Sequence, residues 1–269
     1  MMKQEGMFLC PLFSGSSGNA TAVGLGEGRL LVDAGKPCKA LAQALLQAGI
    51  QPEAIQGLLI THEHIDHVRG AGVFSRRYDV PIYANQGTWE AMAPLIGAIA
   101  PHNIRVFDTG RAFFLGEASI LPFKTPHDAR ESVGYRFEWG GQAMGVMTDV
   151  GVADPMLLEQ VMGCSLLLLE ANHDPELVRS CAYPYLTKQR ILSDRGHLSN
   201  ENAGRALARL YTGGLKQAVL GHLSRDNNFA ELALATIREQ LRQADIRDED
   251  LPLAVAQREQ VTGRFYTGG

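Results

Sequence analysis

The chain has 269 residues, of which 45% are hydrophobic and 20% are charged, a composition typical of a soluble globular protein with a sizeable core. No apolar run approaches the ~20 residues of a membrane-spanning helix, and we interpret the N-terminal MMKQEGMFLCPLF as leading into a first strand, not as a signal peptide. The net charge of −4 argues mildly against nucleic acid as a partner, so any phosphate-binding surface must be local.

The four cysteines form no CxxC pair and follow no regular spacing; they are Cys10, Cys38, Cys164 and Cys181. Scattered cysteines of this kind are typical of reduced, mostly buried thiols. Together with the N-terminus, they predict a cytoplasmic protein with no membrane segment.

The first half of the chain alternates short apolar stretches with stretches of helical period. We expect strands at residues 7–13, 21–25, 29–32, 57–61 and 81–84, and helices at residues 37–48, 67–78 and 88–96. Gly49 closes the first of these helices, as glycine commonly does after a helix C-terminus.

Residues 104–148 are predicted to be largely β, with the clearest strands at 119–123, 133–139 and 142–148. Helices at 155–162, 184–192, 199–211 and 229–244 and strands at 166–170 and 217–221 follow. Strands cluster in each half and a helix-rich stretch follows each cluster, which predicts two packed sheets with helices on their outer faces. No linker or repeat interrupts the pattern, so we expect a single domain over residues 1–269.

A dense histidine motif, THEHIDH, directly follows the apolar strand at residues 57–60. Its potential ligands His62, His64, Asp66 and His67 would repel one another when protonated and would be costly to bury, and a metal ion removes that cost. His62 and His64 point to one side because side chains two residues apart align in extended chain, while Asp66 and His67 begin the next helix. The spacing is not HExxH, which excludes a zincin helix.

HEHIDH resembles the HxHxDH signature of the metallo-β-lactamase superfamily, and the resemblance extends over nearly the whole chain. Asp33 in LVDAG, His127 in TPHD, Asp149 in MTDVG and His222 in VLGHLS match further family positions in the same order. A lone histidine is more often structural and a strand-end aspartate is more often a cap, but the ordered set favours metal ligation. The implied fold is an αββα sandwich with a dinuclear metal site at the sheet edge.

The resemblance also implies how the ligands divide between two divalent ions, Zn²⁺ or Mn²⁺. One ion would be held by His62, His64 and His127, the other by Asp66, His67 and His222, with Asp149 as a bridge. Imidazole and carboxylate suit these metals, and paired ions share a hydroxide that serves as the nucleophile. Asp66 and Asp33, beside the site, are further catalytic candidates.

Other branches of the superfamily fit less well. Position 64 is histidine where the flavodi-iron branch carries glutamate, and true β-lactamases are exported. Too few residues follow His222 for the C-terminal domain of glyoxalase II-type thioesterases, and residues 150–221 are too few for a β-CASP insertion.

Two segments favour phosphodiester chemistry. Residues 169–173, LEANH, and 196–203, GHLSNENA, resemble the HEAT and GHST segments of tRNA 3′-processing endonucleases, in which Glu and His relay a proton to the leaving oxygen. Glu170 and His197 are the candidates here. The alternative is an ordinary strand-end acid and a loop before a helix capped by Ser199. His173 has no assigned role.

The chain most resembles the YycJ/WalJ-type branch, whose members degrade double-stranded DNA from a 5′ end. The resemblance rests on residues 13–21, 75–78, 192–199 and 222–228. The loop Gly15–Gly18 lacks the lysine of a P-loop and is either a plain hairpin turn or a turn that brings backbone N–H groups to the metal cleft. Candidate substrate contacts are Ser16, Asn19, Arg76, Arg77, Arg195 and Arg225, with Lys188 and Arg190 nearby; for each basic residue surface solvation is the alternative.

These observations predict a metal-dependent phosphodiester hydrolase, a 5′-to-3′ exonuclease on DNA that uses a metal-bridging hydroxide, with His197 protonating the departing 3′ oxygen. A hydrolase of thioesters, lactones or cyclic phosphodiesters is the first alternative. A metal-loaded regulatory protein without catalysis is the second, although the full ligand set argues against it. The sequence leaves the oligomeric state open.

Overall fold

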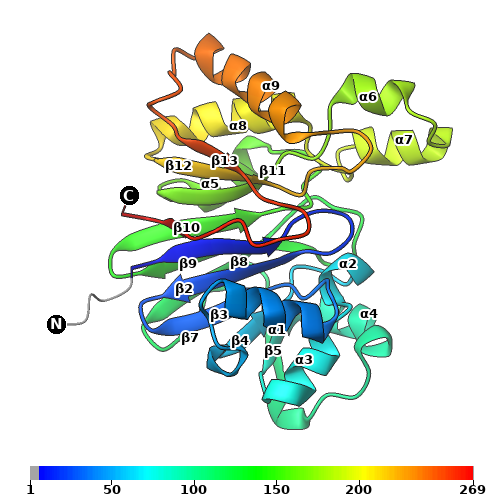
Figure 1. Cartoon of the computed structure of the whole chain (residues 1–269), viewed down its shortest axis with the longest axis vertical. Helices are drawn as coiled ribbons and strands as arrows, with labels where there is room; N and C mark the ends of the chain where they lie inside the picture. Colours follow the sequence, from blue (N-terminus) through cyan, green and yellow to red (C-terminus); the bar gives the residue numbers. More distant parts are fainter. Residues whose placement is uncertain (1–5, 269) are drawn as a thin grey trace.

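The structure, a computed structural model, describes residues 6–268. Two mixed sheets of seven strands each pack face to face, and helices cover both outer faces (Figure 1). The αββα arrangement predicted from the sequence is therefore confirmed. The first five residues of the predicted N-terminal segment lie outside the described range.

The first sheet has the order β14-β1-β2-β3-β4-β5-β6. Its strands are β14 (Phe265–Tyr266), β1 (Phe8–Phe13), β2 (Ala20–Leu25), β3 (Gly28–Val32), β4 (Gly57–Leu59), β5 (Ile82–Asn85) and β6 (Ile104–Phe107). The second sheet has the order β13-β12-β11-β10-β9-β8-β7. Its strands are β13 (Leu253–Val255), β12 (Gln217–Gly221), β11 (Leu166–Glu170), β10 (Gln142–Met147), β9 (Val133–Trp139), β8 (Ala118–Lys124) and β7 (Phe113–Leu115).

The helices divide between the two sheets. Beside the first sheet lie α1 (Cys38–Gln47), α2 (Ile65–Val68), α3 (Ala71–Tyr78) and α4 (Gln86–Ile96), and beside the second lie α5 (Pro155–Val161), α8 (Asn200–Thr212) and α9 (Ala230–Gln243). The pair α6 (Pro175–Ser180) and α7 (Tyr185–Leu192) projects from the end of the second sheet (Figure 1). Short 3₁₀ turns occupy Pro52–Ala54 and Pro101–Asn103.

Alternation of side chains along each strand builds three apolar layers. In β1, Phe8 and Cys10 pack toward the helices of the first sheet, whereas Leu9 packs between the sheets. In β11, Leu167 packs toward the helices of the second sheet and Leu168 packs between the sheets. Because successive side chains in a strand point to opposite faces, one run of apolar residues supplies both layers, as expected for strands buried on both faces.

Strand direction brings the functional loops to one edge of each sheet. Strands β3, β4, β5 and β6 are parallel, as are β10, β11, β12 and β13. Strand β8 runs in the direction of β10, since both are antiparallel to β9. The loops that leave the carboxyl ends of such strands share an edge, where ligands bind in open α/β sheets.

One predicted helix is divided in the structure. Instead of a continuous helix at 67–78, α2 ends at Val68 and α3 begins at Ala71. The amide of Gly70 donates to the carbonyl of Ala34 at 2.7 Å, and a Cβ on Gly70 would lie 2.1 Å from the Lys36 carbonyl oxygen. This close approach turns the backbone away from the helical hydrogen-bond pattern.

One short helix, two short strands and the two 3₁₀ turns were not predicted; the helix is α6 and the strands are β13 and β14. Helix α6 does carry a local signal, because Asp174 accepts hydrogen bonds from the amides of Glu176 and Leu177 ahead of Pro175, a common helix start. The four cysteines are free, and all except the half-buried Cys181 are buried, as predicted. Over residues 6–268, no helix combines the length and apolarity needed to cross a bilayer.

Candidate metal centre

Most of the predicted ligands lie at or just after the carboxyl ends of strands. His62 follows β4, His127 follows β8, Asp149 follows β10 and His222 directly follows β12. Each strand end is fixed by its neighbours in the sheet, so the side chains that come next converge. All four residues are buried.

Three residues at this edge have left-handed backbone. Asp33 has a φ of 61°, Asp149 of 57° and His222 of 56°. Few residues other than glycine adopt this region, and strain of this kind persists where surrounding contacts over-determine it. The reversal at each strand end turns the side chain into the centre.

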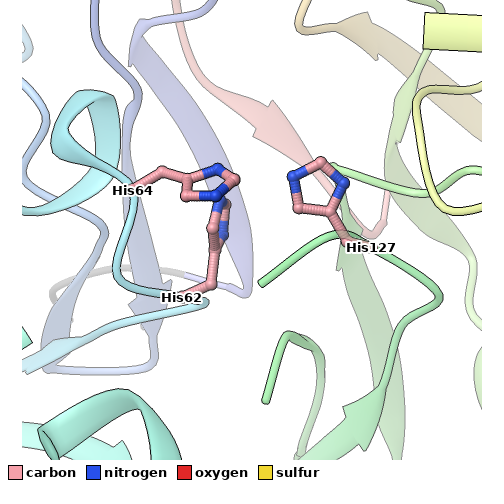
Figure 2. Close-up of side chains that lie close together, drawn as sticks. All are labelled: His62, His64 and His127. Atoms are coloured by element: carbon pink, nitrogen blue, oxygen red, sulfur yellow. The ribbon is translucent and has the colours of Figure 1, made fainter. Parts of the chain in front are cut away.

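The first predicted ligand set is His62, His64 and His127. Their ligand atoms lie within 4.8 Å of one another, and Figure 2 shows the three side chains close together, with their rings in edge-to-face contact. His127 Nδ1 donates to the Gly196 carbonyl at 3.0 Å. The Thr61 hydroxyl donates to Asp33 at 2.9 Å and so accepts from His62 Nδ1 at 3.0 Å. Both contacts leave the Nε2 lone pair for the centre.

The second predicted set is Asp66, His67 and His222, whose ligand atoms also lie within 4.8 Å of one another. His67 Nδ1 donates to Asp33 Oδ2 at 2.8 Å, and His222 Nδ1 donates to Glu170 Oε1 at 2.7 Å. Asp66 Oδ2 lies 3.6 Å from His67 Nε2 and 3.9 Å from His222 Nε2. The Nε2 atoms thus face the cleft in this set too.

Asp149 lies between the two sets. Its Oδ1 is 3.7 Å from His127 Nε2, and its Oδ2 is 3.4 Å from His67 Nε2. A carboxylate in this position can contribute one oxygen to each side.

The donor atoms fit a divalent metal ion. Among the described residues, four buried ligand atoms have no hydrogen-bond partner: His62 Nε2, His127 Nε2, His222 Nε2 and Asp149 Oδ2. Buried polar atoms without partners are rare and costly. Their convergence is explained if they bind a cation, and imidazole nitrogen with carboxylate oxygen is the donor set that divalent metals such as zinc accept.

Glu170 links a predicted ligand to the predicted relay. This fully buried carboxylate accepts from the amides of Val150 at 2.8 Å and Leu198 at 3.1 Å through Oε2. Its Oε1 accepts from His197 Nδ1 at 2.8 Å and from His222 Nδ1 at 2.7 Å. The contact with His197 was expected from the sequence, whereas the contact with His222 was missed.

The pKa values of the buried histidines are shifted in opposite directions. Burial, reinforced by neighbouring imidazoles, lowers the pKa of His62 and of His127. Burial would also lower the pKa of His67, but Asp149, Asp33 and other carboxylates raise it to about 9. The pKa of His222 is likewise raised despite burial, chiefly by Asp149.

The acidic groups shift in the opposite sense. Burial opposes ionisation of Glu170, yet the imidazoles of His197 and His222 hold its pKa well below its usual value. The pKa of Asp149 is also lowered against burial, by His222 and His67. The acids are therefore ionised and paired with imidazoles.

The predicted substrate contacts fall into different environments. Asn19 is buried; its Oδ1 accepts from the Gly15 amide at 2.8 Å, and its Nδ2 lies 3.1 Å from His67 Nε2. Ser16 is exposed on the same loop. Arg225 is exposed three residues after His222.

The other arginines are held by the protein in different ways. Arg195 donates to the His127 carbonyl at 3.2 Å, next to the centre. Arg76 donates to the carbonyls of Ile96 at 3.0 Å and Ala98 at 2.9 Å, so its guanidinium holds the chain after α4. Arg77 packs against the ring of Tyr78.

Further residues at the centre were not singled out from the sequence. Thr61 donates its amide to Asp33 Oδ1 at 2.8 Å. Asp128 accepts from Arg190, and its Oδ1 lies 3.3 Å from His127 Nε2. Thr61 and Asp128 are each adjacent in sequence to a predicted ligand, and the sequence holds no other local sign of their place at the centre.

Comparisons with known proteins identify the family and the fold. A family model described as "Beta-lactamase superfamily domain" matches residues 28–223. The chain is 40% identical over 236 residues to exodeoxyribonuclease YycJ of Bacillus anthracis, covering 88% of this chain and 89% of that protein. It is 39% identical over 247 residues to exodeoxyribonuclease WalJ of Streptococcus pneumoniae serotype 2, covering 91% and 92%. The crystal structure of Zn²⁺-bound PqqB from Methylobacterium extorquens superposes with a TM-score of 0.72 at 16% identity, covering 95% and 99%.

Metal loading should be linked to proton release. His67, whose pKa is raised to about 9, carries a proton at pH 7 in the metal-free protein. The raised pKa of His222 favours its protonated form as well. A metal ion on Nε2 must displace these protons. Binding of Zn²⁺ should therefore release protons, and its apparent affinity should rise with pH up to about 9. Calorimetric titrations at pH 7 in two buffers of different ionisation enthalpy measure this.

The variant His102→Ala is a control, because His102 pairs with Asp79 on the exposed surface and should not change the proton count. A binding enthalpy that is the same in both buffers would contradict the assignment of protons to His67 and His222.

Proposed function

The chain belongs to the metallo-β-lactamase superfamily, and on that premise we propose that it is a metal-dependent 5′-to-3′ exonuclease that acts on double-stranded DNA. The observation that carries the proposal is the identity of about 40% to exodeoxyribonucleases YycJ and WalJ over most of both chains. The polarity and the preference for duplex come from the YycJ/WalJ-type resemblance. The Glu170–His197 contact at 2.8 Å beside the metal ligands supports hydrolysis with an acid for the leaving group.

The residues that would hold two divalent ions, Zn²⁺ or Mn²⁺, are those of the two ligand sets. His62, His64 and His127 would bind one, Asp66, His67 and His222 the other, and Asp149 both. When bound, such ions supply an activated water and neutralise charge on the phosphate. Asp33 and Thr61 orient His67 and His62, so the protein fixes the ligand geometry in advance.

His197 would protonate the leaving oxygen. Its Nδ1–H is held by Glu170 Oε1, which fixes the ring and leaves Nε2 to carry a proton toward the substrate. The bond between phosphorus and the 3′ oxygen breaks, and the proton goes to that oxygen. The released nucleotide then ends in a 3′ hydroxyl, and the phosphate stays on the shortened strand.

Local positive charge would hold the DNA despite the net charge of −4. Arg195 donates to the carbonyl of the predicted ligand His127, and the exposed Arg225 follows the predicted ligand His222 by three residues. Ser16 and Asn19 belong to a loop that reaches the predicted ligands. We place the protein in the cytoplasm, where free thiols such as those observed persist.

The first expected outcome concerns substrate and polarity. Purified protein with Mn²⁺ or Zn²⁺ should release short products from a 5′ label on duplex DNA at the earliest times, while a 3′ label stays on long fragments. Matched RNA and single-stranded DNA serve as comparisons, and Asp149→Asn as the inactive control. Rapid turnover of a thioester or lactone without DNA degradation would replace this function with the small-substrate alternative.

The second concerns the relay. His197→Ala should keep its metal content and lose roughly 10²–10⁴-fold in kcat, the contribution of a general acid. Glu170→Ala should lose activity and also ~10–100-fold in metal affinity, because it supports His222 as well as His197. Metal analysis after dialysis against a chelator, paired with single-turnover kinetics, separates the two. Equal metal loss in both variants would make His197 a ligand instead of an acid.

The third concerns phosphate contacts. Arg225→Ser should weaken DNA binding and lower the slope of log affinity against log salt concentration by about one. Arg209→Ser is the matched control, since Arg209 pairs with Glu159 on the α8–α5 surface. Anisotropy titrations at several salt concentrations measure the slope. An unchanged slope would remove Arg225 from the DNA-binding surface.

A further inference from the structure

An ammonium group lies fixed beside the candidate centre. The Lys36 side chain is only 13% exposed, and its Nζ lies over the ring of Phe13, 5.5 Å from the centroid. Nζ donates to Ser17 Oγ at 3.2 Å and to Glu259 Oε2 at 2.7 Å. A lysine packed in this way has lost much of its rotamer freedom, so its charge is held in one place.

The loop at residues 14–18 connects this ammonium to the predicted ligands. At one end, Ser14 Oγ accepts from the amide of His222 at 2.8 Å. At the other end, Asn19 lies 3.1 Å from His67 Nε2, and the amide of Gly35, the residue before Lys36, donates to the Asn19 carbonyl at 2.8 Å. Lys36 and Ser17 therefore lie at the edge of the candidate metal centre, which we call its rim.

The carboxylate of Glu259 is the anion that pairs with Lys36 and Ser17 at this rim. Its carboxylate accepts from Ser17 Oγ at 2.5 Å and from Lys36, and these contacts lower its pKa. Its side chain is 59% exposed, so rotation alone can withdraw it while Lys36 stays in place. No described residue accepts from the Ser16 or Ser17 amide, which leaves two further donors on the exposed loop.

The proposed cleavage makes a matching ligand. Because the bond to the 3′ oxygen breaks, every turnover leaves a phosphate monoester at the new 5′ end of the strand. This group is a dianion near neutral pH, whereas the phosphodiesters along the strand carry one charge each, and a lysine with hydroxyl and amide donors is a suitable receptor.

We propose that Lys36 and Ser17 bind the 5′-terminal phosphate of the DNA strand, and that Glu259 is the internal counter-ion which this phosphate displaces. The inference rests on the proposed exonuclease function and adds a subsite to it. The subsite positions the end of the strand after each cut and makes the first cut of a 5′-hydroxyl end slower than the cuts that follow.

One substitution in each partner of the Lys36–Glu259 ion pair tests the proposal, and the two are expected to change the preference for a 5′-phosphate end in opposite directions. Duplexes with a 5′-phosphate or a 5′-hydroxyl are compared for the rate of the first cut. Lys36→Met should lower the preference for the phosphate end by roughly tenfold, the loss of a charge-assisted contact. Glu259→Gln should raise that preference about two- to fivefold, since a competing, partly exposed ion pair is removed. Arg238→Met is the control, because Arg238 pairs with Asp248 on the surface near α9.

Equilibrium binding of the same duplexes, labelled at the 3′ end, is measured in parallel. Binding that prefers the phosphate end without any cleavage would overturn the exonuclease function and leave the subsite standing. Cleavage by the unsubstituted protein with no preference between ends would overturn the subsite and leave the function standing. If Lys36→Met weakened binding of the 5′-phosphate and 5′-hydroxyl duplexes equally, Lys36 would contact an internal phosphate. If Lys36→Met and Glu259→Gln changed the preference for the phosphate end in the same direction, the ion pair would be only a structural contact. Either result overturns the proposal.

Discussion

A buried imidazole presents one nitrogen to a cleft in a defined orientation only if its other nitrogen is held by an acceptor. At this centre His127 is held by the Gly196 carbonyl and His222 by Glu170. Each bond selects the tautomer and the ring orientation, and each acceptor comes from a different part of the chain. The arrangement of the sheets and the loops between them is therefore needed before the ligands can point together, and the centre depends on the whole sandwich.

Backbone strain is concentrated where this convergence occurs. Asp33 and His222 take left-handed conformations directly after a strand, and Asp149 does so after Thr148, which separates it from the end of β10. Each of these conformations costs free energy that contacts elsewhere must offset. Sheet hydrogen bonds fix the strand before each residue, and a buried acceptor or imidazole fixes the side chain. A sharp reversal in this position brings a side chain back over the sheet edge, which a gradual turn would not do.

The sequence predicted those features whose signals are local. Apolar periodicity predicted two packed sheets with helices on their outer faces, and the resemblance of HEHIDH and the other ordered motifs to the superfamily implied the αββα sandwich and the ligand set. The proximity of the predicted ligands is now observed. Contacts between distant residues could not be predicted, such as Glu170 with His222, 52 positions apart, or Lys36 with Glu259, 223 positions apart. The break at Gly70 also depends on a distant carbonyl. The interpretation of residues 1–269 as one domain stays a prediction.

The net charge of this protein is a poor guide to its partner, because some of its acidic residues are buried beside histidines and do not contribute to the surface charge. Asp33, Asp149 and Glu170 are buried and face imidazoles, so their charge is compensated inside the centre and reaches little of the surface. An ion bound to these ligands would make the cleft more positive still. The field that acts on a phosphate near the centre therefore comes mainly from the charged groups beside it. Salt screens the more distant surface acids. A chain with a formal charge of −4 can therefore still attract a polyanion at this place.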